Sequence, residues 1–408
     1  MKLNLITLMS DLHAKNKQVL KDNREFIDEL NNLLLDEDIL LEENSTEGSI
    51  DAVFVASGGA EQKFSKIIDN LSEPFILFSN SKNNSLAASF EIKTYSSYKN
   101  HSTCFICGNV EEVAAAMKHI SNIIYTYQKI KDTNLGVIGK PSDWLIASTV
   151  DKKNVYENYK INLVNIPMKE LTDLIELHDI DNTISRYEEL VKKYKDHIDT
   201  LNMALCIYTA IKKLVKKYDL KGLTIRCFEL LKKYKNTACL ALALLNEEGI
   251  VSACEGDVPS LITMYLIYTL TNRPCFMANP SQIDLQKMEL VLAHCTVPFN
   301  MVNKYELMTH FESDQGIGIK GQMMEGNISI CKISPDLKGK NDLIITGNIK
   351  ENLSLPGFCR TQIRVQLDEG DMFGLFKENF GNHVIVTYSD ITPDFYPLLN
   401  LIKNKEIY

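Results

Sequence analysis

The feature that most constrains this chain is a repeated alternation of short apolar runs with longer amphipathic segments. The runs DAVFVAS at 51–57 and EPFILFSN at 73–80 are almost continuously apolar. Helical patterns at 17–35 and 110–131 stand on either side of them. Strands that are apolar on both faces belong to parallel sheets covered by helices. Residues 1–132 are therefore predicted to form an α/β domain around a doubly wound parallel sheet.

The same alternation resumes after a polar connector, KIKDTN, at 129–134. It predicts a second α/β domain over 133–305, again with a doubly wound parallel sheet. Helices are expected at 199–218, 237–247 and 259–271. The strands expected in this domain are LGVIGKP, GLTIRCF, GIVSACEG, PCFMAN and MELVLAHC.

The pattern changes in the last part of the chain, over 306–408. Short β-like segments alternate there with turns rich in Gly, Asn and Asp; examples are NISICKIS, DLIITGNI and NHVIVTYS. This pattern indicates an antiparallel sheet or a small barrel. The predicted fold is therefore α/β, with two doubly wound parallel-sheet domains followed by a β-rich C-terminal domain.

Charge and hydropathy narrow the range of partners. The formal net charge is -9, from 53 acidic and 44 basic residues, which argues against a nucleic acid held through its phosphates. No stretch approaches the ~18 apolar residues of a membrane span. The N-terminal apolar run is interrupted by Asp11 and His13 and makes a poor secretory signal. We expect a cytoplasmic protein with no nucleic-acid or membrane partner.

Three metal-binding residue types stand at the ends of predicted strands. Glu255 follows the strand IVSAC, His294 ends the strand ELVLA, and His383 precedes the strand VIVTY. Ligands on open parallel sheets bind at the carboxyl ends of strands, and one carboxylate with two imidazoles suits a divalent first-row metal. The residues alone leave two plainer interpretations open: His294 as a buried core histidine and Glu255 as a capping carboxylate.

Longer segments around these residues resemble a known family. ACEGDVPSLITMYLIYTLTNRPCFMANP, followed by MELVLAHC, resembles the core of the L-fucose/L-arabinose isomerase superfamily, and most of all the L-fucose isomerase-like proteins. The segments LGVIGKPSDWLIAS, CRTQIRVQL and NHVIVTYSD extend the resemblance over essentially the whole chain. The resemblance implies a metal-dependent aldose–ketose isomerase that acts through an enediol on a small sugar. It also implies a homo-oligomer, a trimer or a hexamer.

The resemblance assigns roles to individual residues. Glu255 of CEGD matches the family's glutamate that binds the metal and takes part in proton transfer, and Asp257 is the neighbouring catalytic candidate. His294 and His383 match the histidines that complete the site. The implied cofactor is a divalent metal, with Mn²⁺ expected.

One departure from the family's pattern concerns its second acidic residue. The matching region holds Ala278 and Asn279, and Asp284 is the nearest carboxylate. Asn279 is therefore a candidate substrate-binding residue, although it could equally cap a turn before Pro280. Arg360 is a second candidate, for a substrate hydroxyl or acid group, with a surface ion pair as the plainer interpretation.

Because the second acid is missing, two further functions stay open. The chain could be a non-catalytic or divergent sugar-binding protein on the same fold. It could also catalyse another metal-dependent reaction of a sugar or sugar acid. Exchange of the substrate's C2 hydrogen with solvent would separate an isomerase from a binder, because only an isomerase breaks that bond.

Overall fold

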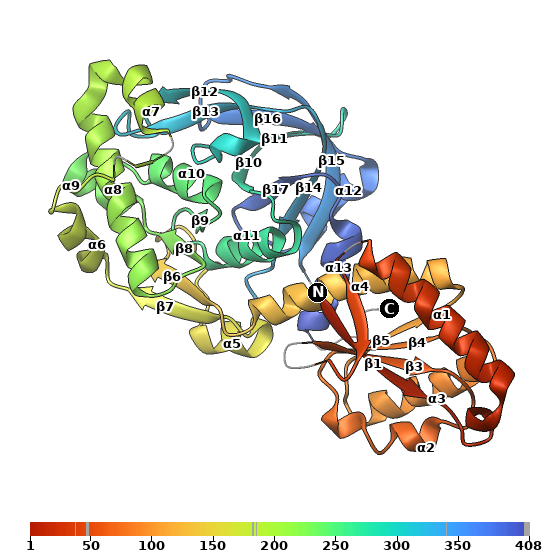
Figure 1. The fold of residues 1–408 in the computed structure, drawn as a ribbon. Coiled ribbons are helices and arrows are strands. Elements are labelled where there is room, and N and C mark those ends of the chain that lie inside the picture. Colours follow the sequence, from red (N-terminus) through yellow and green to blue (C-terminus); the bar gives the residue numbers. More distant parts are fainter. Residues whose placement is uncertain (37, 46–48, 182, 185, 340, 404–408) are drawn as a thin grey trace. The chain divides into compact units, whose positions relative to one another are not determined.

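The structure is a computed structural model that describes residues 1–408 except 37, 46–48, 182, 185, 340 and 404–408. The chain forms two compact units (Figure 1). The first consists of Met1–Gln128 with Tyr396–Tyr408, and the second of Lys129–Phe395. The predicted boundaries of three domains stay a prediction, since compactness alone does not separate the last two.

The first unit is built on a five-stranded parallel sheet with the strand order β2-β1-β3-β4-β5. Its central strands are buried on both faces, as their continuous apolar sequences require, and Val53, Val55 and Leu77 are wholly buried. The elements are β1 (Lys2–Leu8), η1 (His13–Lys15), α1 (Lys17–Leu35), β2 (Leu40–Glu43), β3 (Ile50–Val55), α2 (Glu61–Phe64), η2 (Ile68–Asn70), β4 (Phe75–Ser79), α3 (Ser85–Tyr98), β5 (Thr103–Cys107) and α4 (Val110–Ile130).

The second unit contains a four-stranded parallel sheet with the order β7-β6-β8-β9. Its helices bury long apolar faces; Leu201, Leu205 and Tyr208 of α8 are wholly buried. The elements are β6 (Asn134–Ile138), α5 (Lys152–Tyr159), β7 (Asn162–Ile166), α6 (Met168–Ile175), α7 (Tyr187–Lys193), η3 (Lys195–His197), α8 (Ile198–Lys217), β8 (Gly222–Ile225), α9 (Phe228–Tyr234), α10 (Cys239–Glu247), β9 (Val251–Ala253) and α11 (Val258–Thr271).

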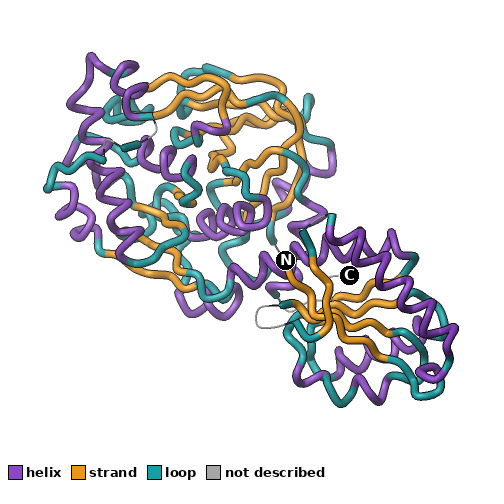
Figure 2. The backbone as a smooth tube through the Cα atoms, in the orientation of Figure 1, coloured by secondary structure: helices purple, strands orange, loops and turns teal. Residues whose placement is uncertain are grey.

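The same unit holds a closed barrel, which Figure 2 shows as a group of strands separate from the parallel sheet. The barrel order is β10-β11-β16-β15-β14-β17, and every neighbouring pair is antiparallel. The elements of this part are β10 (Phe276–Asp284), β11 (Glu289–His294), η4 (Phe299–Met301), β12 (Val302–Met308), β13 (Gly318–Met323), β14 (Gly326–Lys332), β15 (Leu343–Asn352), β16 (Thr361–Gln366), α12 (Glu369–Lys377) and β17 (Val384–Tyr388). The last helix, α13 (Thr392–Ile402), follows them, and from Tyr396 on it belongs to the first unit.

The barrel confirms the predicted fold class and corrects one detail of it. The segments PCFMAN and MELVLAHC were expected in the second parallel sheet, but they form β10 and β11 of the barrel. The reason is the short connection between the two strands, Leu285–Met288, which is a turn. A parallel pair needs a crossover of a dozen or more residues. A turn as short as this one can therefore join only antiparallel strands.

Helix α11 links the parallel sheet to the barrel within the second unit. It contacts β8 and β9 on one side and β14 and β17 on the other, as Figure 1 shows. Its residues are apolar all round, so it can be buried between the two sheets. Across the described residues, no helix is both long and apolar enough to pass through a membrane.

Candidate metal centre

The second unit brings together the three predicted metal ligands. Glu255, His294 and His383 each offer one ligand atom, and these atoms lie within 4.8 Å of one another. Glu255 follows β9, His294 is the last residue of β11, and His383 directly precedes β17. β10 lies between β11 and β17 in the barrel, and β11 ends and β17 begins at the same level of β10, beside Ala278 and Asn279, so the two histidines are brought to one level of the barrel.

The backbone at Glu255 has an unusual conformation. Glu255 has φ 61° and Gly256 has φ 75°, so two consecutive residues lie in the left-handed region. At Gly256 a Cβ atom would lie 2.6 Å from the carbonyl oxygen of Lys140, so only glycine fits there. The carbonyl oxygen of Glu255 accepts a 2.8 Å hydrogen bond from the Ser142 amide. Strained backbone that surrounding contacts hold in place is typical of functional sites.

The carboxylate of Glu255 is held from two sides. The indole Nε1 of Trp144 donates to Oε2 at 2.6 Å, and Oε1 lies 3.6 Å from Nε2 of His383. Burial raises the pKa of Glu255, but the nearby His383 and His294 and the Trp144 hydrogen bond outweigh it and lower the pKa. Glu255 is therefore a carboxylate at neutral pH and can bind a cation.

His383 points one bare nitrogen into this cluster. Its Nδ1 lies 2.9 Å from Oδ2 of Asp257, which assigns the proton to Nδ1. Its Nε2 is buried and has no hydrogen-bond partner among the described residues. At 3.6 Å the Oε1 of Glu255 is too far away for a hydrogen bond. A buried imidazole nitrogen with a free lone pair fits a metal, and a carboxylate on its other nitrogen is the usual orienting partner.

His294 has the properties of a neutral ligand. Its Nδ1 lies 3.0 Å from Oγ1 of Thr296, and its ring centroid lies 5.7 Å from that of His383. Burial and the neighbouring His383 lower the pKa of His294 to about 3. With both imidazoles neutral, the donor set is one carboxylate and two imidazole nitrogens. That set fits a divalent first-row metal and leaves coordination positions for a substrate.

Asp257 lies behind His383. It caps α11 by accepting a 2.9 Å hydrogen bond from the Ser260 amide, and its Oδ2 lies 2.9 Å from Nζ of Lys332. The side chains of both Asp257 and Lys332 are 0% exposed. Burial raises the pKa of Asp257, but the Lys332 charge and the His383 hydrogen bond hold it well below its usual range. The predicted catalytic role of Asp257 stays a prediction, and this position favours orienting His383.

Asn279, one of the two predicted substrate-binding residues, lies on the strand between those that carry the two histidines. Asn279 lies in β10 opposite Ala293, and the preceding Ala278 lies opposite Val384, so this stretch runs between the strands that carry the two histidines. It is part of a strand and not a turn before Pro280. Asp284 lies at the far end of β10, where its Oδ1 accepts hydrogen bonds from two turn amides.

Arg360 precedes β16, and its guanidinium binds mainly to the chain itself. Its Nε donates to the carbonyl oxygen of Thr309 at 2.7 Å, and its Nη2 donates to Thr309 Oγ1 at 3.1 Å. Nη2 also lies 3.6 Å from Oδ1 of the exposed Asp314. Substrate binding by Asn279 and Arg360 therefore stays a prediction.

Sequence reasoning missed an aromatic row next to Glu255. The ring of Trp144 packs edge-on against Phe228 at 5.0 Å, and Phe228 packs edge-on against His310 at 5.5 Å. Trp144 is the chain's only tryptophan and remains 50% exposed, a signal that could have drawn attention to it. His310, at the other end of this row, is buried, with 7% of its surface exposed.

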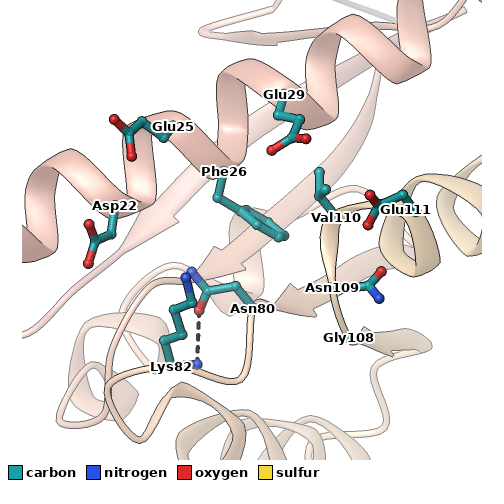
Figure 3. Close-up of a pocket in the computed structure, with 10 residues that line it drawn as sticks. All are labelled: Asp22, Glu25, Phe26, Glu29, Asn80, Lys82, Gly108, Asn109, Val110 and Glu111. Carbon is teal, nitrogen blue, oxygen red and sulfur yellow. Dashed lines mark hydrogen bonds between the residues drawn. The ribbon is translucent and has the colours of Figure 1, made fainter.

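The first unit has a separate pocket of about 280 Å³ at the carboxyl ends of β4 and β5 (Figure 3). Carboxylates dominate its lining, since Asp22, Glu25, Glu29 and Glu111 surround it and Lys82 is its one cationic residue. Asn80 Oδ1 accepts a 3.1 Å hydrogen bond from the Lys82 amide. A pocket of this charge disfavours an anionic ligand.

Comparison with known proteins finds proteins named as sugar isomerases. The chain is 22% identical over 307 residues to the sulfoquinovose isomerase of Priestia aryabhattai, a match that covers 72% of this chain and 68% of that protein. It is 20% identical over 310 residues to the sulfoquinovose isomerase of Alkalicoccus urumqiensis, covering 72% and 69%. A 90-residue stretch is 33% identical to the corresponding enzyme of Clostridium sp. (strain MSTE9), over 22% of this chain and 20% of that one.

No family model matches the chain. The relatives nevertheless confirm the prediction of an enzyme, and they indicate a sugar isomerase. They support the resemblance noted in the sequence at this level, and the particular branch of the superfamily stays a prediction.

Proposed function

We propose that this protein is a metal-dependent aldose–ketose isomerase that acts through an enediol. The observation that carries the proposal is the buried cluster of Glu255, His294 and His383, in which a bare imidazole nitrogen faces a carboxylate. The isomerase relatives support the same chemistry. Mn²⁺ is the metal we expect, because the resemblance to the L-fucose/L-arabinose isomerase superfamily implies it.

The reaction moves two hydrogens of the sugar. C2 loses its hydrogen and O2 loses its proton, while C1 gains a hydrogen and O1 gains a proton. A bound divalent ion would act as a Lewis acid that polarises the carbonyl and the adjacent hydroxyl. The ionised Glu255 is placed to hold and move a hydroxyl proton beside it. The half-exposed Trp144, which hydrogen-bonds Glu255, offers an apolar face for the sugar ring.

The relatives suggest the substrate class. They are named for sulfoquinovose, a sugar that carries a sulfonate group, so we propose an aldose with an acidic substituent and take sulfoquinovose as the first candidate. Arg360 is the cation that we propose for the acidic group. The predicted homo-oligomer, a trimer or a hexamer, and the cytoplasmic location remain part of the proposal.

The test is isomerisation by the purified protein loaded with Mn²⁺. NMR should show sulfoquinovose converting to its ketose and, in D₂O, exchange of the C2 hydrogen. A chelator should abolish both, and Glu255→Gln should lower kcat by about 10²–10⁴-fold because a proton carrier is lost. Glu157→Gln is the matched control, since Glu157 lies on α5 with its side chain 56% exposed.

Two outcomes would overturn the proposal. One is a folded, Mn²⁺-binding protein that exchanges no C2 hydrogen across a panel of pentoses, hexoses, deoxyhexoses and sugar acids, which would favour the sugar-binding alternative. The other is isomerase activity that survives complete removal of the metal.

A further inference from the structure

His310 lies between β12 and β13, in a connection whose backbone is firmly held. Its amide donates to the carbonyl oxygen of Gln315 at 3.0 Å, and its own carbonyl oxygen accepts from the Asp314 amide at 2.9 Å. The preceding Thr309 is fixed by Arg360 through two hydrogen bonds. Side chains on a rigid support can hold a reacting group in place.

The row of aromatic rings places the imidazole of His310 on the wall that begins at Glu255. Trp144 donates to Glu255, Phe228 packs against Trp144, and His310 packs against Phe228. The wall thus runs from the carboxylate of Glu255 to the imidazole of His310, and the two groups are close enough for Glu255 to raise the pKa of His310. No other basic side chain stands on this row of rings in the part of the chain that the structure describes.

One nitrogen of this imidazole is available for chemistry. Nδ1 lies 3.3 Å from Oγ of Ser313, while Nε2 has no hydrogen bond to any described residue. Burial lowers the pKa of His310, Glu255 raises it and Arg360 lowers it, with a lowered pKa as the result. The other ionisable neighbours in this connection are Glu312, whose own pKa is raised by burial and by Glu255, and the exposed Asp314, which lies beside Arg360. At neutral pH the imidazole is therefore uncharged and can accept a proton.

We propose that His310 is the second proton carrier of the isomerisation and takes the place of the acidic residue missing at Ala278 and Asn279. This inference rests on the proposed function. Nε2 takes the proton from C2, and the electrons of that C–H bond form the C1=C2 double bond of the enediol. The same Nε2 then returns the proton to C1 as the C2=O2 carbonyl forms. Glu255 carries the hydroxyl proton from O2 to O1, so atoms and charge balance over the cycle.

The different roles of Glu255 and His310 follow from their surroundings. Glu255 already accepts a hydrogen bond from Trp144 and faces His383, and it is one of the residues that would hold a bound ion. His310 is no ligand of the cluster, so its lone pair stays free to act as a base. An imidazole also has an unperturbed pKa near 6.5, close to the operating pH at which a general base works best.

The experiment compares His310→Gln with Glu312→Gln as the matched control in the same connection. We expect His310→Gln to lower kcat by about 10²–10⁴-fold and to lose C2 exchange in D₂O to the same extent. Its Mn²⁺ affinity, read from the fluorescence of Trp144, and its melting temperature should match the wild type. Glu312→Gln should stay within a few-fold of wild type, and added imidazole should restore part of the activity of His310→Gly.

A second measurement covers the case in which the His310 variants fail to fold. The acid limb of kcat/KM should report a base with a pKa below about 6.5 in the wild type. It should move to higher pH in Arg360→Gln, because the cation that lowers the pKa of His310 is removed. Glu255, Glu312 and His294 remain unchanged around His310 in this variant.

Three results would overturn the inference: full C2 exchange in His310→Gln, loss of exchange in Glu312→Gln instead, or an acid limb unmoved in Arg360→Gln. Absence of isomerisation in the wild type would instead reject the proposed function, so the two failures are distinguishable.

Discussion

The buried ion pair between Lys332 and Asp257 gives the sharpest test of how the site is held. Both side chains are 0% exposed, and Lys332 also donates to Oγ of Ser260. Lys332→Met removes one charge and leaves Asp257 buried with only His383 beside it. Breaking a buried pair from one side costs about 3–5 kcal/mol, because the remaining charge loses its compensation. For a unit of this size the melting temperature should fall by roughly 6–20 °C.

Removing the charge of Asp257 as well should restore most of the stability that Lys332→Met loses. Asp257→Asn keeps an oxygen that can cap α11, and combined with Lys332→Met it leaves no uncompensated charge. Unfolding is followed by the fluorescence of Trp144, which lies in the same unit, with a chelator present. A single variant that melts within about 2 °C of the wild type would refute the reasoning. So would a double variant no more stable than Lys332→Met.

The pH dependence of this loss follows from the sign of the Asp257 shift. The folded-state pKa of Asp257 is depressed, so its stabilising contribution is present above the unfolded value and disappears as pH falls through the folded value. Without Lys332 the folded-state pKa rises. The stability gap between wild type and Lys332→Met should therefore narrow from about pH 7 to about pH 4, since Asp257 then takes up a proton in the variant.

Three further changes test other parts of the site. Asn279→Asp should tighten Mn²⁺ binding about tenfold, or about 1.4 kcal/mol, by restoring a carboxylate; equal affinities would place Asn279 away from the metal. Gly256→Ala should destabilise the protein by more than the roughly 1–2 kcal/mol of a left-handed residue, because its Cβ would lie 2.6 Å from the oxygen of Lys140. The control, Gly357→Ala, has φ +84° and open space, so its urea midpoint should shift less. Burial lowers the pKa of His383, but hydrogen bonds and charges from Asp257 and Glu255 raise it overall. His383 therefore stabilises the fold more at low pH, and the metal-free His383→Asn variant should lose more stability near pH 6 than near pH 8. A larger loss near pH 8 would contradict a raised pKa for His383.

The sequence predicted the parts of the fold that depend on local pattern. Continuous apolar runs correctly indicated buried parallel strands such as β3 and β4, because a strand covered on both faces has no polar side to show. The assignment of β10 and β11 to a parallel sheet was wrong, although the short turn between them already required an antiparallel pair. The strand β2, Leu40–Glu43, was missed, since two of its four residues are acidic and it pairs only with β1 at the sheet's edge.

Two signals in the sequence predicted residues of the site: their positions at strand ends and the family resemblance. Glu255 and His294 were singled out because each stands where a strand ends, and ligands gather there, whereas His383 precedes its strand and was assigned a role by the resemblance. Lys332 was missed although it interrupts the apolar strand NISICKIS, a position where a charge needs a buried partner. Its partner Asp257 is distant in sequence, so the pair becomes visible only after α11 packs against β14.

Helix α11 explains why a site assembled from distant segments can be held so firmly. Glu255 and Asp257 stand at its start, and Asp257 reaches both Lys332 of β14 and His383 before β17. The charge of Asp257 is favoured there by the positive end of the helix dipole as well as by Lys332. The cluster that we propose to hold the metal therefore exists only when the parallel sheet, α11 and the barrel are packed together. An ion bound there favours that packed state over any state in which α11 has separated from the barrel, by an amount set by its concentration relative to its Kd.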